Sequence, residues 1–194
     1  MDHPHRYGRG GRLIAISTEY SQADQRPIQL TRPTIEHGGE IRALIRACPP
    51  LDVNSTYAYL LLAHHFAETC ILAWEDGRAV GFVSAYVPPR REDTLFVWQV
   101  AVHPDARGRG LGKRMLLALL KRKALSRITR IETTVSPGNG ASRAMFAALA
   151  RALDARIEER PLFTPQMFGT EHHEEERLLV IGPIQKPAEK GEMA

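Results

Sequence analysis

Residues 102–116 read VHPDARGRGLGKRML, a glycine-rich and basic segment between an apolar run and a helical stripe. Glycines let backbone amides approach a ligand closely, and the first turn of a helix leaves amides unpaired beside a partial positive charge. The segment therefore predicts a phosphate site, with basic side chains for the outer oxygens, at Arg107, Arg109, Lys113 and Arg114. A solvated turn that binds nothing is the alternative.

Two common phosphate loops do not fit this segment. A P-loop requires glycine where Arg107 stands and a magnesium-binding hydroxyl where Arg114 stands. A dinucleotide fingerprint requires a third glycine where Lys113 stands, and it follows the first strand of its domain, whereas this loop follows the fourth predicted strand. Both readings are excluded.

The surrounding periodicity predicts an α+β domain. Apolar runs and helical stripes predict a β-α-α-β-β-β-α-β-α-β-β order. Consecutive strands in the middle, followed by strand–helix–strand crossovers, favour a mixed, mostly antiparallel sheet flanked by helices. The expected strands are 28–34, 70–74, 79–87, 94–102, 130–135, 155–163 and 177–183, and the expected helices are 36–47, 55–66, 110–125 and 139–153.

The composition is that of one globular domain. The chain has 194 residues, of which 43% are hydrophobic and 25% charged. We expect a disordered tail over 1–26, a folded domain over 27–184 and a flexible tail over 185–194. With no membrane-length apolar run and no signal sequence, a cytoplasmic location is expected. Two cysteines, Cys48 and Cys70, predict buried free thiols rather than a disulfide framework or a zinc site.

The basic charge is local rather than spread along a stripe. The formal net charge is +4 and the sequence pI is about 9.3. Inside the domain the dense basic patches are 107–114 and 121–130, without the interleaved aromatics that a nucleic-acid surface would carry. This distribution favours one anionic small molecule over nucleic acid.

VWQVAVHPDARGRGLGKRML (97–116) and IETTVSPGNGASRAMFAAL (131–149) resemble the GNAT acetyltransferase superfamily. The resemblance implies a sheet splayed between its fourth and fifth strands, with acetyl-CoA in the splay and no metal. Main-chain groups of Gln99, Val100 and Val102 would then pair with the pantetheine arm. The remaining cofactor contacts that it implies are Arg107, Gly108, Arg109, Gly110, Leu111, Gly112, Lys113, Asn139 and Ser142.

Four separated segments, 48–70, 96–102, 131–139 and 168–183, resemble the diaminobutyrate acetyltransferase family of ectoine biosynthesis. That resemblance implies acetyl transfer to the 4-amino group of L-2,4-diaminobutyrate by a homodimeric enzyme. Two alternatives stay open: a GNAT enzyme for another amine, and a regulator that binds acetyl-CoA without turnover.

A diamino acid requires acidic partners and a shaped wall. The expected substrate contacts are Asp52, Asn54, Tyr57, Trp98, His173, Glu174 and Glu176. Each has a simpler alternative: Asp52 and Asn54 as helix caps, Trp98 as core, and the acidic cluster as a solvated loop. Metal ligation by His172, His173 and the glutamates is a further alternative.

The expected mechanism is direct attack by the amine on the thioester. An aliphatic ammonium titrates near pH 10, so a base must first remove a proton, and Glu176, His173, Asp52 or a bound water are the candidates. The Val100 amide would stabilise the oxyanion. Many superfamily members carry a tyrosine that protonates the leaving thiolate, but Phe146 stands at that position, which leaves Tyr57 or water for the role.

Overall fold

Strand β4, Thr94–Val102, lies in the middle of a seven-stranded sheet. The computed structural model describes residues 27–170 and 173–185. The predicted tail over 1–26, nearly all of the predicted tail over 185–194, and His172 lie outside the described residues.

The observed elements follow the predicted order. The strands are β1 Gln29–Thr31, β2 Ile71–Glu75, β3 Arg78–Tyr86, β4, β5 Arg130–Val135, β6 Arg156–Phe163 and β7 Glu176–Gly182. The helices are α1 Gly38–Arg46, α2 Thr56–His65, α3 Leu111–Leu120 and α4 Gly140–Ala152, with short 3-10 turns η1 Ile35–His37, η2 Pro104–Ala106, η3 Lys123–Leu125 and η4 Pro165–Phe168. None of the helices among the described residues is long and apolar enough to cross a membrane.

The sheet has the order β1-β2-β3-β4-β5-β7-β6. Only the β4–β5 pair is parallel among the described strands, and every other neighbouring pair is antiparallel. The predicted fold class, an α+β domain with a mixed and mostly antiparallel sheet, is confirmed.

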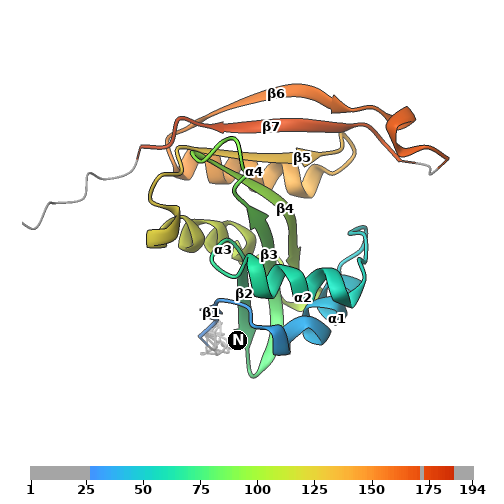
Figure 1. Cartoon of the computed structure of the whole chain (residues 1–194), viewed down its shortest axis with the longest axis vertical. Coiled ribbons are helices and arrows are strands. Elements are labelled where there is room, and N and C mark those ends of the chain that lie inside the picture. The colour runs from blue at the N-terminus through green and yellow to red at the C-terminus, as the bar shows by residue number, and fades with distance from the viewer. Residues whose placement is uncertain (1–26, 171–172, 186–194) are drawn as a thin grey trace, which may run out of the picture.

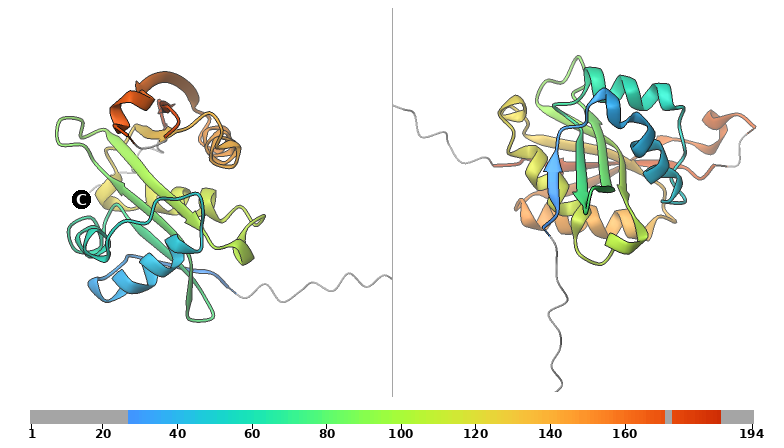
Figure 2. Two further views of the ribbon diagram at one scale, coloured as in Figure 1. Left: turned by 90° about the vertical axis from the view of Figure 1, so that its right-hand side faces the viewer. Right: turned by 90° about the horizontal axis from the view of Figure 1, so that it is seen from below.

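Two apolar clusters pack on opposite faces of this sheet. The larger one joins β2–β5 and β7 to α3 and α4, with Met115, Leu116 and Leu149 almost fully buried. The smaller one joins β2–β4 to α1 and α2 through Ile41, Tyr59 and other residues. Figure 1 shows α4 beneath β5, β7 and β6, and the two views of Figure 2 show α1 and α2 on the other side of the strands β2 to β4.

Helix α2 buries a different face from the predicted one. The expected stripe of Leu61, Leu62 and Phe66 is only partly right, because Leu61 and Phe66 are exposed while Tyr59 and Leu62 are buried. The helix is apolar on most sides, so periodicity alone cannot select its buried face. The hydroxyl of Tyr59 accepts a hydrogen bond from the Asn54 amide at 3.1 Å, which allows this polar atom to be buried.

Candidate active site

Strands β4 and β5 pair over a short distance and then part. Their register runs from Thr94 opposite Arg130 to Val97 opposite Thr133. Residues 98–102 of β4 continue without a partner on β5, although they stay paired with β3 on the other edge. Backbone groups on the β5 side of this segment are therefore available to an extended ligand, as the predicted splay requires.

A β-bulge at Trp98 marks the place where the strands part. Ser84 of β3 lies opposite Gln99 and Ala85 lies opposite Val97, so Trp98 is an extra residue in β4. Val97 belongs to the larger cluster, and Val100 packs against the same cluster. The bulge thus reverses the alternation and places Trp98 and Gln99 on the face of α1 and α2.

The backbone of β4 presents two amides to the open edge. His103 N–H donates to Val80 O of β3 at 2.9 Å. Because bonded and non-bonded positions alternate in an antiparallel ladder, the amides of Val100 and Val102 face the opposite edge. The Gln99 amide instead donates to Ser84 Oγ at 3.1 Å, so it points towards β3 and away from the splay. Of the three predicted main-chain contacts, Val100 and Val102 present their amides to the splay.

The loop before α3 has the geometry of an anion site. Gly108 and Gly110 adopt the left-handed region, with φ of 75° and 66°, which few other residues tolerate. The first helical bond of α3 runs from Arg114 N–H to Gly110 O at 3.0 Å. Within the described residues, no protein acceptor is recorded for the amides of 108–113. A pyrophosphate could therefore accept hydrogen bonds from these amides at the positive end of the helix.

The basic side chains of this loop are not equally available. Arg109 makes a bidentate ion pair with Glu75 at the end of β2, with N···O distances of 2.7 and 3.1 Å. Its hydrogen bonds lower the pKa of Glu75 and raise the pKa of the Arg109 guanidinium. Arg107 Nε donates to Val102 O at 3.1 Å. The predicted role of the Arg109 side chain on phosphate oxygens is thus weakened, and its amide remains available.

Gly112 brings α3 close to its neighbours. A Cβ atom at this position would lie 2.7 Å from Met145 Sδ and 3.3 Å from Val100 Cγ1. The absence of a side chain therefore lets the first turn of α3 sit directly beside β4 and α4. This contact places the unpaired amides of the loop before α3 next to the point where β4 and β5 part.

Helix α4 begins beside the same opening. The Asn139 side chain accepts a hydrogen bond from Ser142 N–H at 3.1 Å and so caps the helix. Phe146 is only 2% exposed and belongs to the larger cluster. The residue at the position of the superfamily tyrosine is therefore a core residue here.

The two cysteines are buried free thiols, as predicted. Burial raises the pKa of the Cys48 thiol, and it raises that of Cys70 to about 11. Both thiols stay protonated near neutral pH, which excludes a thiolate nucleophile at either position.

The face opposite α4 carries the predicted acceptor residues. Leu179 and Ile181 of β7 lie in the cluster with α4. By strand alternation, Glu176, Leu178 and Val180 lie on the opposite face. We call this side of β5, β7 and β6, together with Trp98, the acceptor face. Trp98 is 45% exposed, so the core alternative for this residue is wrong.

The α1–α2 loop reaches the acceptor face through Gln99. The Gln99 side chain donates from Nε2 to the backbone oxygen of Asp52 at 2.9 Å. Ser55, rather than Asp52 or Asn54, caps α2 by accepting from Ala58 N–H at 3.2 Å. The capping alternative for the Asp52 and Asn54 side chains is therefore wrong.

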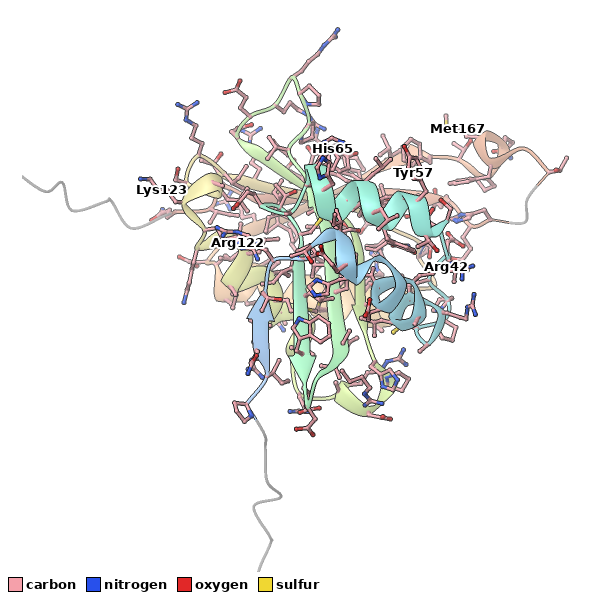
Figure 3. All side chains as sticks on the ribbon, turned by 60° about the horizontal axis from the view of Figure 1, so that its bottom comes forward. Arg42, Tyr57, His65, Arg122, Lys123 and Met167 are labelled. Atoms are coloured by element: carbon pink, nitrogen blue, oxygen red, sulfur yellow. The ribbon has the colours of Figure 1, made fainter. Side chains whose placement is uncertain are left out.

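Tyr57 lies in the first turn of α2 and is 67% exposed. Figure 3 shows its side chain on the side of α2 that looks towards the segment carrying Met167. Its side chain is therefore open to solvent on this side of α2.

The β6–β7 loop carries the remaining predicted residues. The His173 ring stacks on Phe168, with ring centroids 4.0 Å apart and an interplanar angle of 11°. Glu176 is the first residue of β7 and lies opposite Phe163 of β6. Glu174 Oε2 accepts a hydrogen bond from Gly138 N–H at 3.0 Å, which commits this carboxylate to a backbone contact. Among the described residues, no group of three or more His, Cys, Asp or Glu side chains could hold a metal ion.

Sequence reasoning missed three partners in this site. Ser84, Glu75 and Phe168 each fix a residue of the site, namely Gln99, Arg109 and His173. Ser84 and Glu75 lie 15 and 34 positions from their partners, and only the folded sheet brings them together. Nothing in the local sequence could have indicated these contacts.

Parted parallel strands, a bulge and a glycine-rich turn before a helix define a class of acyl-CoA-dependent transferases. Residues 39–150 match the acetyltransferase (GNAT) family. The chain belongs to this family. The ribosomal-protein-S18-alanine N-acetyltransferase of Escherichia coli, at 15% identity and a TM-score of 0.59, shares the fold over 84% of this chain and 98% of its own.

Three more similar relatives are all named for acetyl transfer to diaminobutyrate. The L-2,4-diaminobutyric acid acetyltransferase of Bordetella parapertussis is 50% identical over 159 residues, which cover 81% of this chain and 86% of the relative. That of Methylotuvimicrobium alcaliphilum is 48% identical over 157 residues, covering 81% and 91%. The diaminobutyrate acetyltransferase EctA of Paenibacillus lautus, solved with L-2,4-diaminobutyric acid and coenzyme A, is 40% identical with a TM-score of 0.80, covering 84% of this chain and 98% of that one.

Proposed function

We propose that this protein transfers an acetyl group from acetyl-CoA to the 4-amino group of L-2,4-diaminobutyrate. The proposal is supported by the parting of β4 and β5 after Val97, with the exposed Trp98 at that point, in a chain 40% identical to a relative solved with this diamino acid and coenzyme A. The product is N4-acetyl-2,4-diaminobutyrate, a step of ectoine biosynthesis.

The residues present suit acetyl-CoA. Its pyrophosphate would accept hydrogen bonds from the amides of 108–113, and its pantetheine arm would pair with the free edge of β4 at Val100 and Val102. The Asn139 and Ser142 turn lies at the start of α4, beside this path. No step of the reaction needs a metal.

The acceptor face suits a small diamino acid. The carboxylates of Asp52 and Glu176 complement its ammonium groups, and the exposed ring of Trp98 offers a wall on which a cation can stack. His173, Asn54 and Tyr57 supply further hydrogen-bonding groups.

The reaction begins with the loss of a proton from the 4-ammonium group. Glu176 is the first candidate for the base, directly or through a water, because it starts β7 on the acceptor face; His173 and Asp52 are the others. The nitrogen lone pair then forms the C–N bond at the thioester carbonyl, and the Val100 amide stabilises the oxygen that becomes negative.

Collapse of that adduct breaks the C–S bond and releases coenzyme A as a thiolate. Phe146 is buried and has no proton to donate, so the exposed Tyr57 hydroxyl or a water supplies the proton. The second nitrogen proton leaves to the base or to solvent, which balances the reaction. No covalent enzyme intermediate forms.

We also propose a cytoplasmic homodimer. β6 is an edge strand of the sheet, and its Ile157, Leu162 and Phe163 are all exposed. An edge of this kind is suited to pairing with a second copy. Sedimentation equilibrium tests the proposal, and a monomer at micromolar concentration contradicts it.

Thiol release from acetyl-CoA, measured against a panel of diamines, amino acids and peptide amino termini, tests the main proposal. Diaminobutyrate should give the highest kcat/KM, and NMR of the product should place the acetyl group on N4. Turnover of another amine without diaminobutyrate would assign a different acceptor. Saturable acetyl-CoA binding without thiol release for any amine would indicate a regulator.

A further inference from the structure

We infer that Glu174 is a positioning residue that fastens the β6–β7 loop to the turn that precedes α4, and does not bind the substrate directly. The inference rests on the proposed function and deepens it. It assigns one carboxylate of the acidic cluster to the backbone, and it connects the acceptor side of the site to the coenzyme side.

The contact itself is close and specific. Glu174 Oε2 lies 3.0 Å from Gly138 N, and a Cβ atom at Gly138 would lie 2.7 Å from Glu174 Oε1 and 2.9 Å from Oε2. Both carboxylate oxygens therefore lie where a side chain at position 138 would displace them. Because one oxygen accepts the Gly138 amide, the carboxylate is directed towards the backbone.

The two ends of this contact belong to different halves of the site. Gly138 immediately precedes Asn139, which caps α4 by accepting from Ser142 N–H. Glu174 follows His173 directly, and His173 Nδ1 lies 2.7 Å from the backbone oxygen of Glu174. The contact between Glu174 and Gly138 therefore ties the backbone next to His173 to the turn that precedes α4.

A second contact holds the other side of the loop. His173 stacks on Phe168, whose ring meets Phe163 edge-on with centroids 6.5 Å apart. Phe163 lies opposite Glu176 across the β6–β7 ladder. The aromatic series fixes the loop to the sheet, whereas Glu174 fixes it to α4. Removing Glu174 should thus loosen one attachment without unfolding the domain.

Four variants test this inference. Glu174→Ala removes the carboxylate that accepts the hydrogen bond. Gly138→Ala keeps this carboxylate but displaces it from the Gly138 amide. Glu174→Gln keeps an amide oxygen that can accept from Gly138 N–H. Glu175→Ala is the matched control, because it removes a neighbouring carboxylate that pairs instead with Arg177 at 3.2 Å.

Glu174→Ala and Gly138→Ala should each raise KM for diaminobutyrate about three- to tenfold, the effect of one net hydrogen bond. The Kd of acetyl-CoA should change less than about twofold, because the loop before α3 is untouched. The double variant should be no worse than either single one, since both remove the same contact. Glu174→Gln and Glu175→Ala should resemble the parent protein. Hydrogen exchange over 173–176 should increase in Glu174→Ala and in Gly138→Ala, and not in the other two variants.

Two results would overturn the inference. If Glu174→Gln loses as much as Glu174→Ala, the negative charge acts directly on the substrate. If Glu174→Ala and Gly138→Ala leave both KM and hydrogen exchange unchanged, the contact has no positioning role. If the parent protein does not acetylate diaminobutyrate, the proposed function fails, and hydrogen exchange still reports on the loop.

Discussion

Gln99 donates its side-chain amide to the backbone oxygen of Asp52 at 2.9 Å, which ties the α1–α2 loop to β4 directly beside the bulge. Gln99 is 6% exposed, and its Oε1 has no recorded partner in the described structure. One buried side chain thus ties the backbone at Asp52 to the strand beside Trp98.

Gln99→Leu should therefore weaken the binding of diaminobutyrate. The leucine fills a similar volume but cannot donate to Asp52 O, so the loop loses a fixed position. KM for diaminobutyrate should rise about tenfold, as expected for a lost buried hydrogen bond. Steady-state thiol release measures it, with His65→Ala on the exposed side of α2 as the control. An unchanged KM would mean that the loop is held by other contacts.

Trp98→Ala should separate activity from stability. The side chain is 45% exposed, so its loss should cost about 1 kcal/mol or less of unfolding free energy. Phe82→Ala, at a fully buried position, should cost about 3–5 kcal/mol. Urea titration gives both values, and kcat/KM for diaminobutyrate should fall more than about tenfold for Trp98→Ala alone at equal folded fraction. Full activity would exclude Trp98 from the acceptor site.

Asp52→Ala and Glu176→Ala should lose turnover while coenzyme binding persists. Neither residue lies in the loop before α3, so calorimetry should give an acetyl-CoA Kd within about twofold of the parent value. For the residue that acts as base, the loss should be in kcat, by about 100-fold or more. Unchanged turnover in both variants would mean that these carboxylates are surface groups that take no part in catalysis.

Gly110→Ala should weaken acetyl-CoA binding. Gly110 has a φ of 66°, which costs an alanine about 1–2 kcal/mol, and relief of that strain would rotate the amides before α3. Gly39→Ala is the matched control, since both positions have open space around a new Cβ atom and Gly39 lies in a helix. Calorimetry should show a weaker Kd for Gly110→Ala only. Equal Kd values would mean that the turn accommodates alanine without loss of acetyl-CoA affinity.

The Arg109–Glu75 pair predicts a pH-dependent contribution to stability. Its hydrogen bond to Arg109 lowers the pKa of Glu75 in the folded state. The pair therefore stabilises the protein above the usual carboxyl pKa, and the contribution is lost as the pH falls through the lower, folded-state value. Glu75→Gln should lower Tm at pH 7, and the difference from the parent should shrink towards pH 3. A difference that is constant with pH would exclude the ion pair as its source.

The order of the elements and the position of the phosphate loop could be predicted because both have local causes. Alternating and helical periodicities identify the strands and helices, and glycines mark the turn before α3. By contrast, the bulge at Trp98 leaves no mark in TLFVWQVAV, which reads as a nearly continuous apolar run. Contacts such as Gln99 to Asp52 or Glu174 to Gly138 join segments 47 and 36 positions apart. They depend on tertiary structure and could not be predicted.

The extra residue in β4 shifts the alternation of its side chains by one position. Before it, odd-numbered side chains such as Val97 face α3 and α4; after it, even-numbered ones such as Val100 do. Removing one residue between these two would give β4 one continuous alternation and abolish the bulge at the point where the strand leaves β5. The length of this strand is therefore constrained more tightly than the identity of the side chain that makes the insertion.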